Sequence, residues 1–209
     1  MEPITLTTER LVLRPLGPPD ADAVLAACQN AEIQRWTTIP SPYGREHAED
    51  FVGRISPDGW REDTLYNFGV FTKEGRAEEG STEEGSTTES GVLVGSMGLL
   101  ELAGLRGPQR QAEIGFWTAA EQRGRGYTAE AARALARWAF VSLGVERLEW
   151  FAEAGNHGSR AVALSVGFRM EGTQRARIVH RGVRRDAWAA ALLPSDWQLP
   201  SKTPYVLAP

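Results

Sequence analysis

The middle of the sequence contains a strand, a glycine-rich turn, a helix and a second strand in direct succession. Residues 112–118, AEIGFWT, alternate as in an extended strand, and the turn EQRGRG follows at 121–126. The run 128–143 has apolar side chains at helical spacing, and RLEWFAE at 147–153 alternates again. Two parallel strands joined by a helix form a right-handed crossover in one sheet. This stretch therefore predicts a βαβ unit at the centre of the fold.

The elements expected on either side of this unit are mostly antiparallel strands. Strands are predicted at 10–16, 65–71, 92–100, 167–179 and 184–193, and helices at 20–28, 44–55 and 159–166. Pro57 is expected to end the second of these helices. The order predicts an α/β (α+β) fold with a mixed, mostly antiparallel central sheet and one parallel crossover. We expect one domain over residues 1–193 and a C-terminal tail at 194–209.

An acidic segment separates two of the predicted strands. Residues 73–91 contain EEGST twice, and their six glutamates against one lysine and one arginine account for the formal net charge of −4 of the whole chain. Ala77 is the only aliphatic residue there, so the segment has almost nothing to bury. We expect a flexible acidic insertion that joins two antiparallel neighbours. It is either a solvated loop or an acidic lid.

Composition excludes several classes of protein. The 23 basic and 27 acidic residues give no basic bias toward nucleic acid or anionic lipid. The sequence has neither a membrane-length apolar run nor the order of a signal peptide at its start, so we expect a cytoplasmic protein without a membrane partner. A single cysteine and three histidines without ligand spacing predict no metal site.

The glycine-rich turn is suited to binding an anion. The N–H groups at a helix N-terminus lack intrahelical partners and carry a partial positive charge. Gly124 and Gly126 permit close approach of a ligand, and Arg123 and Arg125 add charge that a phosphate would bind. The alternative is a tight turn with solvated arginines.

Two familiar phosphate-binding motifs do not fit this turn. A P-loop ends in Gly-Lys-Ser/Thr, whereas Tyr127 and Thr128 follow Gly126. A dinucleotide fold places an acidic ribose ligand about 20 residues after the turn, at the end of the next strand. Glu146 has the distance but precedes its strand, and Glu153 ends the strand but lies too far along the chain.

The turn and the sequence around it resemble the GNAT acetyltransferase superfamily. The spacing Glu121-x-x-Gly124-x-Gly126 is similar to its R/Q-x-x-G-x-G/A acetyl-CoA motif. LTTERLVLRPL, EIGFW, RGRGYTAEA, NHGSRAVALSVGFRMEG, Asp186 and LLPSDW resemble its ribosomal-protein N-terminal acetyltransferase (RimJ/RimL-like) branch. The glutamate at the first motif position and the acidic insertion depart from that pattern. The resemblance covers nearly the whole chain and implies a GNAT fold whose parallel crossover forms the acetyl-CoA cleft.

The resemblance also implies how acetyl-CoA is held. The strands at 112–118 and 147–153 are expected to splay, so that the pantetheine arm pairs with the backbone of Phe116, Trp117 and Thr118. The implied phosphate contacts come from the following turn: Arg123, Gly124, Arg125, Gly126, Tyr127 and Thr128. By the same resemblance, Asn156 contacts the pantetheine and Ser159 lies near the sulfur as a donor to the leaving thiolate. Both residue types also favour helix N-caps, so capping is the competing interpretation.

Glu113 is the predicted general base. Alternation places Glu113 on the face of its strand opposite the mostly apolar one, and Gly115 beside it leaves room for a substrate. An ordinary surface carboxylate paired with an arginine is the competing interpretation. Cys28 is expected to be a core residue, so transfer proceeds directly in a ternary complex. Trp36, Trp60 and Trp117 are predicted either to line the acceptor groove or to pack in the core.

These expectations together predict an acetyl-CoA-dependent N-acetyltransferase. Its partner is a primary amine, either the α-amine of a protein or a small-molecule amine, and the chain acts as a monomer or homodimer. An α-amine, with a pKa of about 8, demands less of its base than a lysine at about 10.4. The alternative is a catalytically inactive CoA-binding regulatory module.

Overall fold

The chain folds around one eight-stranded sheet in the computed structural model, which describes residues 1–73 and 91–206. The sheet has the order β1-β2-β3-β4-β5-β6-β8-β7. Its strands are β1 (Leu6–Thr7), β2 (Leu11–Arg14), β3 (Tyr66–Thr72), β4 (Leu93–Leu100), β5 (Gln111–Thr118), β6 (Arg147–Glu153), β7 (Arg169–His180) and β8 (Val183–Leu192). Only β5 and β6 pair in parallel, so the predicted mixed, mostly antiparallel sheet is confirmed.

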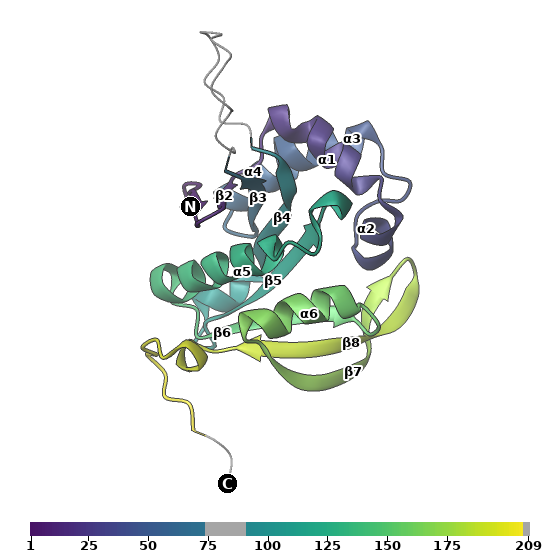
Figure 1. Cartoon of the computed structure of the whole chain (residues 1–209). Helices are drawn as coiled ribbons and strands as arrows, with labels where there is room; N and C mark the ends of the chain where they lie inside the picture. Colours follow the sequence, from purple (N-terminus) through teal and green to yellow (C-terminus); the bar gives the residue numbers. More distant parts are fainter. Residues whose placement is uncertain (74–90, 207–209) are drawn as a thin grey trace.

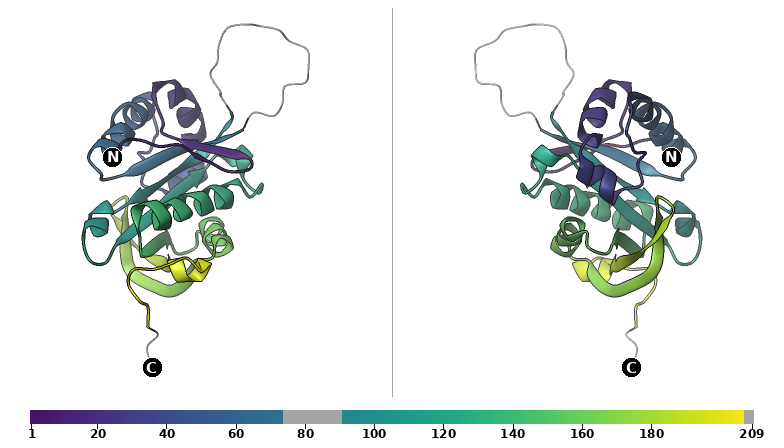
Figure 2. Two further views of the ribbon diagram at one scale, coloured as in Figure 1. Left: turned by 90° about the vertical axis from the view of Figure 1, so that its left-hand side faces the viewer. Right: turned by 90° about the vertical axis from the view of Figure 1, so that its right-hand side faces the viewer.

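Six α-helices of the described residues accompany the sheet. They are α1 (Ala21–Cys28), α2 (Ala31–Trp36), α3 (Arg45–Asp50), α4 (Ser56–Arg61), α5 (Tyr127–Trp138) and α6 (His157–Val166). Helices α1 to α4 gather at one end of the molecule, α5 and α6 lie side by side across the sheet, and the β7–β8 hairpin curves around the other end (Figures 1 and 2).

The alternation of β5 and the periodicity of α5 explain how the central layer packs. Ala112 and Ile114 are 1% exposed and face the large core beneath α5. On the helix, Ala131 and Leu135 pack against the same core. A second core lies under α1 and α3 and includes Cys28, which is 1% exposed, as predicted. The side chains on the other face of β5 are therefore free to line a site between these layers.

In the N-terminal half, one predicted helix boundary is wrong and one helix was not predicted. The helix expected to end before Pro57 continues to Arg61, because a wider turn over Phe51–Ile55 precedes the proline and its N–H bonds reach back five residues. Helix α2 was not predicted. It has only six residues and is begun by Asn30, whose side chain accepts hydrogen bonds from two backbone N–H groups.

The acidic insertion predicted at 73–91 falls on residues 74–90, outside the described residues. The strands that flank it, β3 and β4, pair antiparallel as expected. The first residues of the predicted tail pack on the body of the molecule. Trp197 contacts Phe140 at 5.8 Å between ring centroids and donates a hydrogen bond from Nε1 to the carbonyl of Val166.

No helix over 1–73 and 91–206 has the length and apolar character of a membrane span. Within the same residues, no group of three or more His, Cys, Asp or Glu side chains is arranged to hold a metal ion.

Candidate active site

The parallel strands β5 and β6 separate after three paired residues. Gln111, Ala112 and Glu113 pair with residues 147–149, and the pairing between the two strands ends there. Beyond this point, β5 pairs only with β4 and β6 only with β8 among the described residues. The facing edges at 114–118 and 150–153 therefore offer backbone N–H and C=O groups to a ligand inserted between them.

Helix α5 begins at the wide end of this gap. Gly126 is its N-cap with φ +77°, and Gly124 has φ +74°, conformations that favour glycine. The space beside Gly124 is open: a Cβ at this position would have no other protein atom within 4 Å, so no neighbouring side chain or backbone excludes a larger residue there. Arg123 and Arg125 are exposed beside it. The turn thus presents bare backbone and a helix N-terminus with exposed arginines on either side of Gly124, which is the chemistry of a phosphate site.

A network from the connection between β1 and β2 holds this turn. Arg10 donates to Glu130 on α5 at 2.7 Å and to the carbonyl oxygen of Arg125 at 3.1 Å. Thr8 donates to the same glutamate at 2.6 Å. The guanidinium of Arg10 also lies 4.6 Å above the ring of Tyr127. The resemblance implied phosphate contacts for Tyr127, but its half-buried ring packs against Arg10 and the core.

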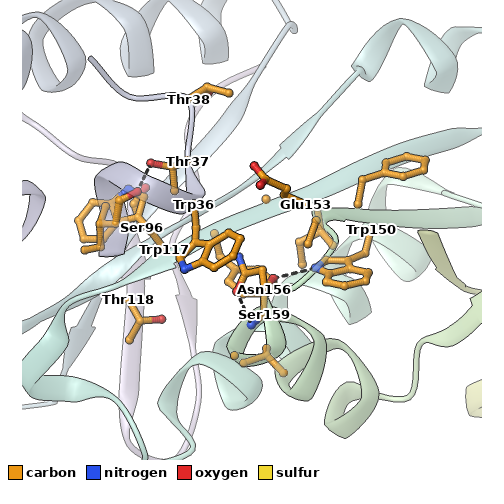
Figure 3. Close-up of a pocket in the computed structure, with 18 of the residues that line it drawn as sticks. Trp36, Thr37, Thr38, Ser96, Trp117, Thr118, Trp150, Glu153, Asn156 and Ser159 are labelled. Carbon is orange, nitrogen blue, oxygen red and sulfur yellow. Dashed lines mark hydrogen bonds between the residues drawn. The ribbon is translucent and has the colours of Figure 1, made fainter. Parts of the chain in front are cut away.

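One cavity of about 1120 Å³ runs from the turn, through the gap, to the β7–β8 hairpin. It brings together nine of the twelve predicted site residues: Glu113, Phe116, Trp117, Thr118, Arg123, Gly124, Thr128, Asn156 and Ser159. Arg125, Gly126 and Tyr127 lie outside its lining. Figure 3 shows Trp36 from the N-terminal half reaching the same cavity as Asn156 and Ser159 from the C-terminal half.

Glu113 faces this cavity from the last position at which β5 pairs with β6. The pKa of Glu113 is raised to about 7, mainly by burial; the charges of Glu101 and Glu149 also raise it, and the charge of Arg177 opposes them. Glu149 is its direct partner on β6. A carboxyl group with a pKa of about 7 exchanges protons near neutral pH, so the chemistry of the site suits a general base.

Asn156 and Ser159 have separate structural roles at the start of α6. The Asn156 side chain is the N-cap and accepts a hydrogen bond from the Ser159 N–H at 3.1 Å. The Ser159 hydroxyl oxygen instead accepts a hydrogen bond from Trp150 Nε1 at 3.1 Å (Figure 3). Because that bond uses a lone pair of the oxygen, the hydroxyl hydrogen is available to a ligand in the cavity.

Many residues line the cavity without having been predicted there, and Glu153, His180 and Arg177 are among them. Glu153, considered in the sequence only as a ribose ligand, ends β6 beside the gap, and His180 ends β7. Arg177 also reaches the cavity. Their position depends on the bend of the β7–β8 hairpin, which no local pattern indicates. Of the three tryptophans predicted for a groove or for packing, Trp36 and Trp117 line the cavity.

Trp60 is a core residue. It is 1% exposed and donates from Nε1 to the carbonyl of Asn67 at 2.8 Å. Its ring stacks on Tyr66.

The residues present fit acetyl-CoA as cosubstrate. The open edge of β5 can pair with the two amides of a pantetheine arm. The open space at Gly124 lets a diphosphate reach the N–H groups at the start of α5. Thr118 and Thr128 join the two regions through a hydrogen bond of 2.7 Å between their hydroxyls. The binding surface is thus continuous from strand to helix.

Comparisons with known proteins agree with this geometry. A sequence model of the acetyltransferase (GNAT) domain matches residues 10–169. The chain is 30% identical over 194 residues to the putative ribosomal N-acetyltransferase YdaF of Bacillus subtilis (strain 168), over 91% of this chain and 94% of that protein.

Two solved structures share the fold. One is of a putative ribosomal-protein-serine acetyltransferase from Vibrio cholerae, with a TM-score of 0.74 and 24% identity over 91% of this chain and 98% of that one. The other is Mycobacterium smegmatis RimJ in complex with CoA-disulfide, with a TM-score of 0.75 and 20% identity over 95% of this chain and 92% of that one.

Proposed function

The chain belongs to the GNAT acetyltransferase family and is an acetyl-CoA-dependent N-acetyltransferase, and we propose that its acceptor is the α-amine of a peptide or protein chain. The observation that carries this proposal is the Glu113 carboxylate, which faces the cavity with a pKa raised to about 7. The name of the Bacillus subtilis relative, a putative ribosomal N-acetyltransferase, supports the same class of acceptor.

The choice of an α-amine follows from matching acid and base. Proton transfer from an α-ammonium with a pKa of about 8 to Glu113 is uphill by roughly 1.4 kcal/mol, since one pKa unit is worth about that amount. The same transfer from a lysine ammonium at about 10.4 is uphill by roughly 4.6 kcal/mol. The difference corresponds to more than two orders of magnitude in the population of the neutral amine. Glu113 therefore deprotonates an α-ammonium more readily than a lysine ammonium.

We assign the catalytic steps to two residues of the cavity. When bound, acetyl-CoA supplies the activated acetyl group. Glu113 removes the proton from the ammonium, and an N–H of residues 116–118 on the open edge of β5 stabilises the negative charge that develops on the acyl oxygen. The Ser159 hydroxyl keeps its proton and donates a hydrogen bond to the departing thiolate, which takes up the second proton that the nitrogen loses as the C–S bond breaks and the amide forms. Because a thiolate is already a good leaving group, we expect this last contribution to be modest.

An amine panel tests the proposal. Purified protein is given acetyl-CoA with peptides that have free N-termini, the same peptides with blocked N-termini and one internal lysine, polyamines, aminoglycosides and free amino acids. Thiol release is followed and the product site is mapped by fragmentation in a mass spectrometer. We expect release that depends on peptides with a free N-terminus, and acetyl on the α-nitrogen.

Two other results would contradict the proposal in different ways. Turnover with blocked peptides through lysine, or with small amines alone, would overturn the choice of acceptor. Saturable CoA binding without thiol release for any amine would favour the inactive CoA-binding module.

A further inference from the structure

A cluster of charged side chains closes the end of the cavity away from the phosphate turn. The Glu153 carboxylate on β6 accepts two hydrogen bonds from the guanidinium of Arg35 on α2, at 2.7 and 3.0 Å. His180 Nδ1 lies 3.3 Å from the same carboxylate, and Arg185 Nε lies 3.9 Å from it. Glu153 is 8% exposed, so three elements distant in the sequence converge on one buried carboxylate.

The carboxylate fixes the tautomer of the imidazole. Arg35 holds the pKa of Glu153 below its ordinary value, so the carboxylate carries no proton with which to bond. The hydrogen between the two side chains must then belong to His180 Nδ1, and in the neutral ring Nε2 carries the lone pair. The contact with Glu153 therefore presents a hydrogen-bond acceptor at Nε2.

His180 Nε2 is buried without a partner among the described residues. The side chain is 10% exposed and forms part of the cavity wall. Buried side-chain nitrogens nearly always have a hydrogen-bond partner, and those that lack one in a cavity wall are candidates for ligand contacts. Glu113, Ser159 and the phosphate turn leave this atom without a role.

We propose that His180 Nε2 accepts a hydrogen bond from the acceptor substrate, from an N–H or O–H other than the amine that becomes acetylated. In a peptide, such a donor is the amide N–H of the second residue or the side-chain hydroxyl of a first-position serine. Glu153 is the positioning residue that keeps the imidazole in this tautomer. The inference rests on the proposed peptide acceptor and makes His180 a determinant of acceptor specificity rather than of acetyl-CoA binding.

Two substitutions of His180 separate this role from structural support. His180→Asn retains an amide near the position of Nδ1, which can still bond Glu153, and leaves nothing at Nε2. His180→Gln places an amide oxygen near the position of Nε2. We expect His180→Asn to raise the acceptor KM about tenfold, since a lost hydrogen bond is typically worth about that factor, with kcat and the acetyl-CoA KM within twofold. His180→Gln should recover most of the loss.

The probes are a hexapeptide beginning Ser-Ala, its Ala-Ala analogue, and the Ser-Ala peptide with its second amide N-methylated. The analogue that lacks the bonded donor should have a raised KM with the wild type and no additional increase with His180→Asn. His47→Asn is the matched control, because His47 lies on α3 outside the cavity lining, so the same substitution there should leave the acceptor KM unchanged.

Three results would overturn the inference. They are an unchanged acceptor KM in a folded His180→Asn protein, a fall in kcat with no change in KM, and equal losses with asparagine and glutamine. Should the wild type acetylate only small amines, the peptide proposal fails by itself. The same two variants then test His180 with the best small amine, and an unchanged KM again refutes the contact.

Discussion

Glu113 combines a position set by strand alternation with a pKa set mainly by burial and then by neighbouring charges. Its place on the face opposite Ala112 and Ile114 follows from the sequence alone. Its raised pKa does not, because the fold buries the carboxyl group, and Glu101 and Glu149 approach it only through the pairing of the sheet. The sequence thus predicts which residue is the base but not its pKa.

Replacing Glu113 with glutamine should lower kcat by about 10² to 10⁴, the usual contribution of a general base. The base acts when deprotonated, so the wild-type kcat/KM for the acceptor, which reports groups of the free enzyme, should rise with pH through an inflection near 7, the pKa of Glu113 in the free site. The variant should lose this inflection. Steady-state kinetics over a pH series provides the measurement.

Glu149→Gln is the control for this prediction. Removing its negative charge should lower the pKa of Glu113 and shift the inflection to lower pH with the plateau retained, because Glu149 raises that pKa.

Folding of the Glu113→Gln variant is checked by its melting temperature. The Glu113 pKa is raised on folding, so the native state binds more protons and loses stability as pH rises from about 4.3 toward 7. Glu113→Gln should therefore melt no lower than wild type at pH 8. Wild-type kcat in that variant would mean that solvent or another residue is the base.

Ser159 and Asn156 divide two tasks that the sequence left open between them. Asn156 is the cap of α6, so Asn156→Ala should cost about 0.5 to 2 kcal/mol of stability, measured by denaturant unfolding.

Ser159→Ala should lower kcat several-fold at saturating substrates, because the hydroxyl hydrogen that bonds the thiolate is removed. It also leaves Trp150 Nε1 without its acceptor, which should lower the melting temperature. Kinetics must therefore be measured well below the melting transition, and undiminished kcat there would limit Ser159 to bonding Trp150.

At the scale of elements, sequence patterns predicted whatever was long and regular. β5, α5 and β6 were found within a few residues because alternation and helical spacing persist over several turns or pleats. α2 was missed because six residues carry too little periodicity, and the helix containing Pro57 was cut short because the wider turn before it has no clear signature. The contacts of α2 explain why this omission matters for function.

Helix α2 connects the separate parts of the site. Arg123 of the phosphate turn donates to the Asn30 side chain that caps α2, at 3.2 Å. Arg35 binds Glu153, and the carbonyl of Gln34 accepts a hydrogen bond from Arg181 of the hairpin at 2.7 Å. The element that the sequence did not reveal therefore ties the acetyl-CoA end of the cavity to the acceptor end. His180 was missed for a related reason, since its partner Glu153 lies 27 residues earlier.

The turn before α5 yields a prediction at the same scale. Gly124→Ala should raise the acetyl-CoA KM at least tenfold, because the added methyl group occupies open space through which the phosphates approach the helix N–H groups. Backbone strain at φ +74° also contributes to the change, so a matched control is needed. Gly182 has the same φ and equally open surroundings but lies in the β7–β8 turn, outside the cavity lining. Gly182→Ala should lose similar stability and keep the acetyl-CoA KM. Equal KM values for the two variants would refute the phosphate assignment.

At the scale of the whole molecule, the two halves of the chain build one site around a gap in the sheet, with no thiol in its wall. Cys28 is buried under α1, outside the cavity lining, and burial raises the pKa of its thiol to about 12. A thiol in that state is a poor nucleophile at neutral pH, because the thiolate is the reactive form. One cavity connects the phosphate turn with the β7–β8 hairpin, so the geometry supports direct transfer between acetyl-CoA and an acceptor bound in it.

The initial-velocity pattern tests this central claim most directly. Rates are measured over a grid of acetyl-CoA and acceptor peptide concentrations, with wild type and Cys28→Ala side by side. Transfer within a ternary complex predicts double-reciprocal lines that intersect, the same pattern for both proteins, and no acetylated protein when acetyl-CoA is supplied alone. Parallel lines, together with an acetyl-enzyme that forms in the absence of amine and disappears when amine is added, would contradict the account.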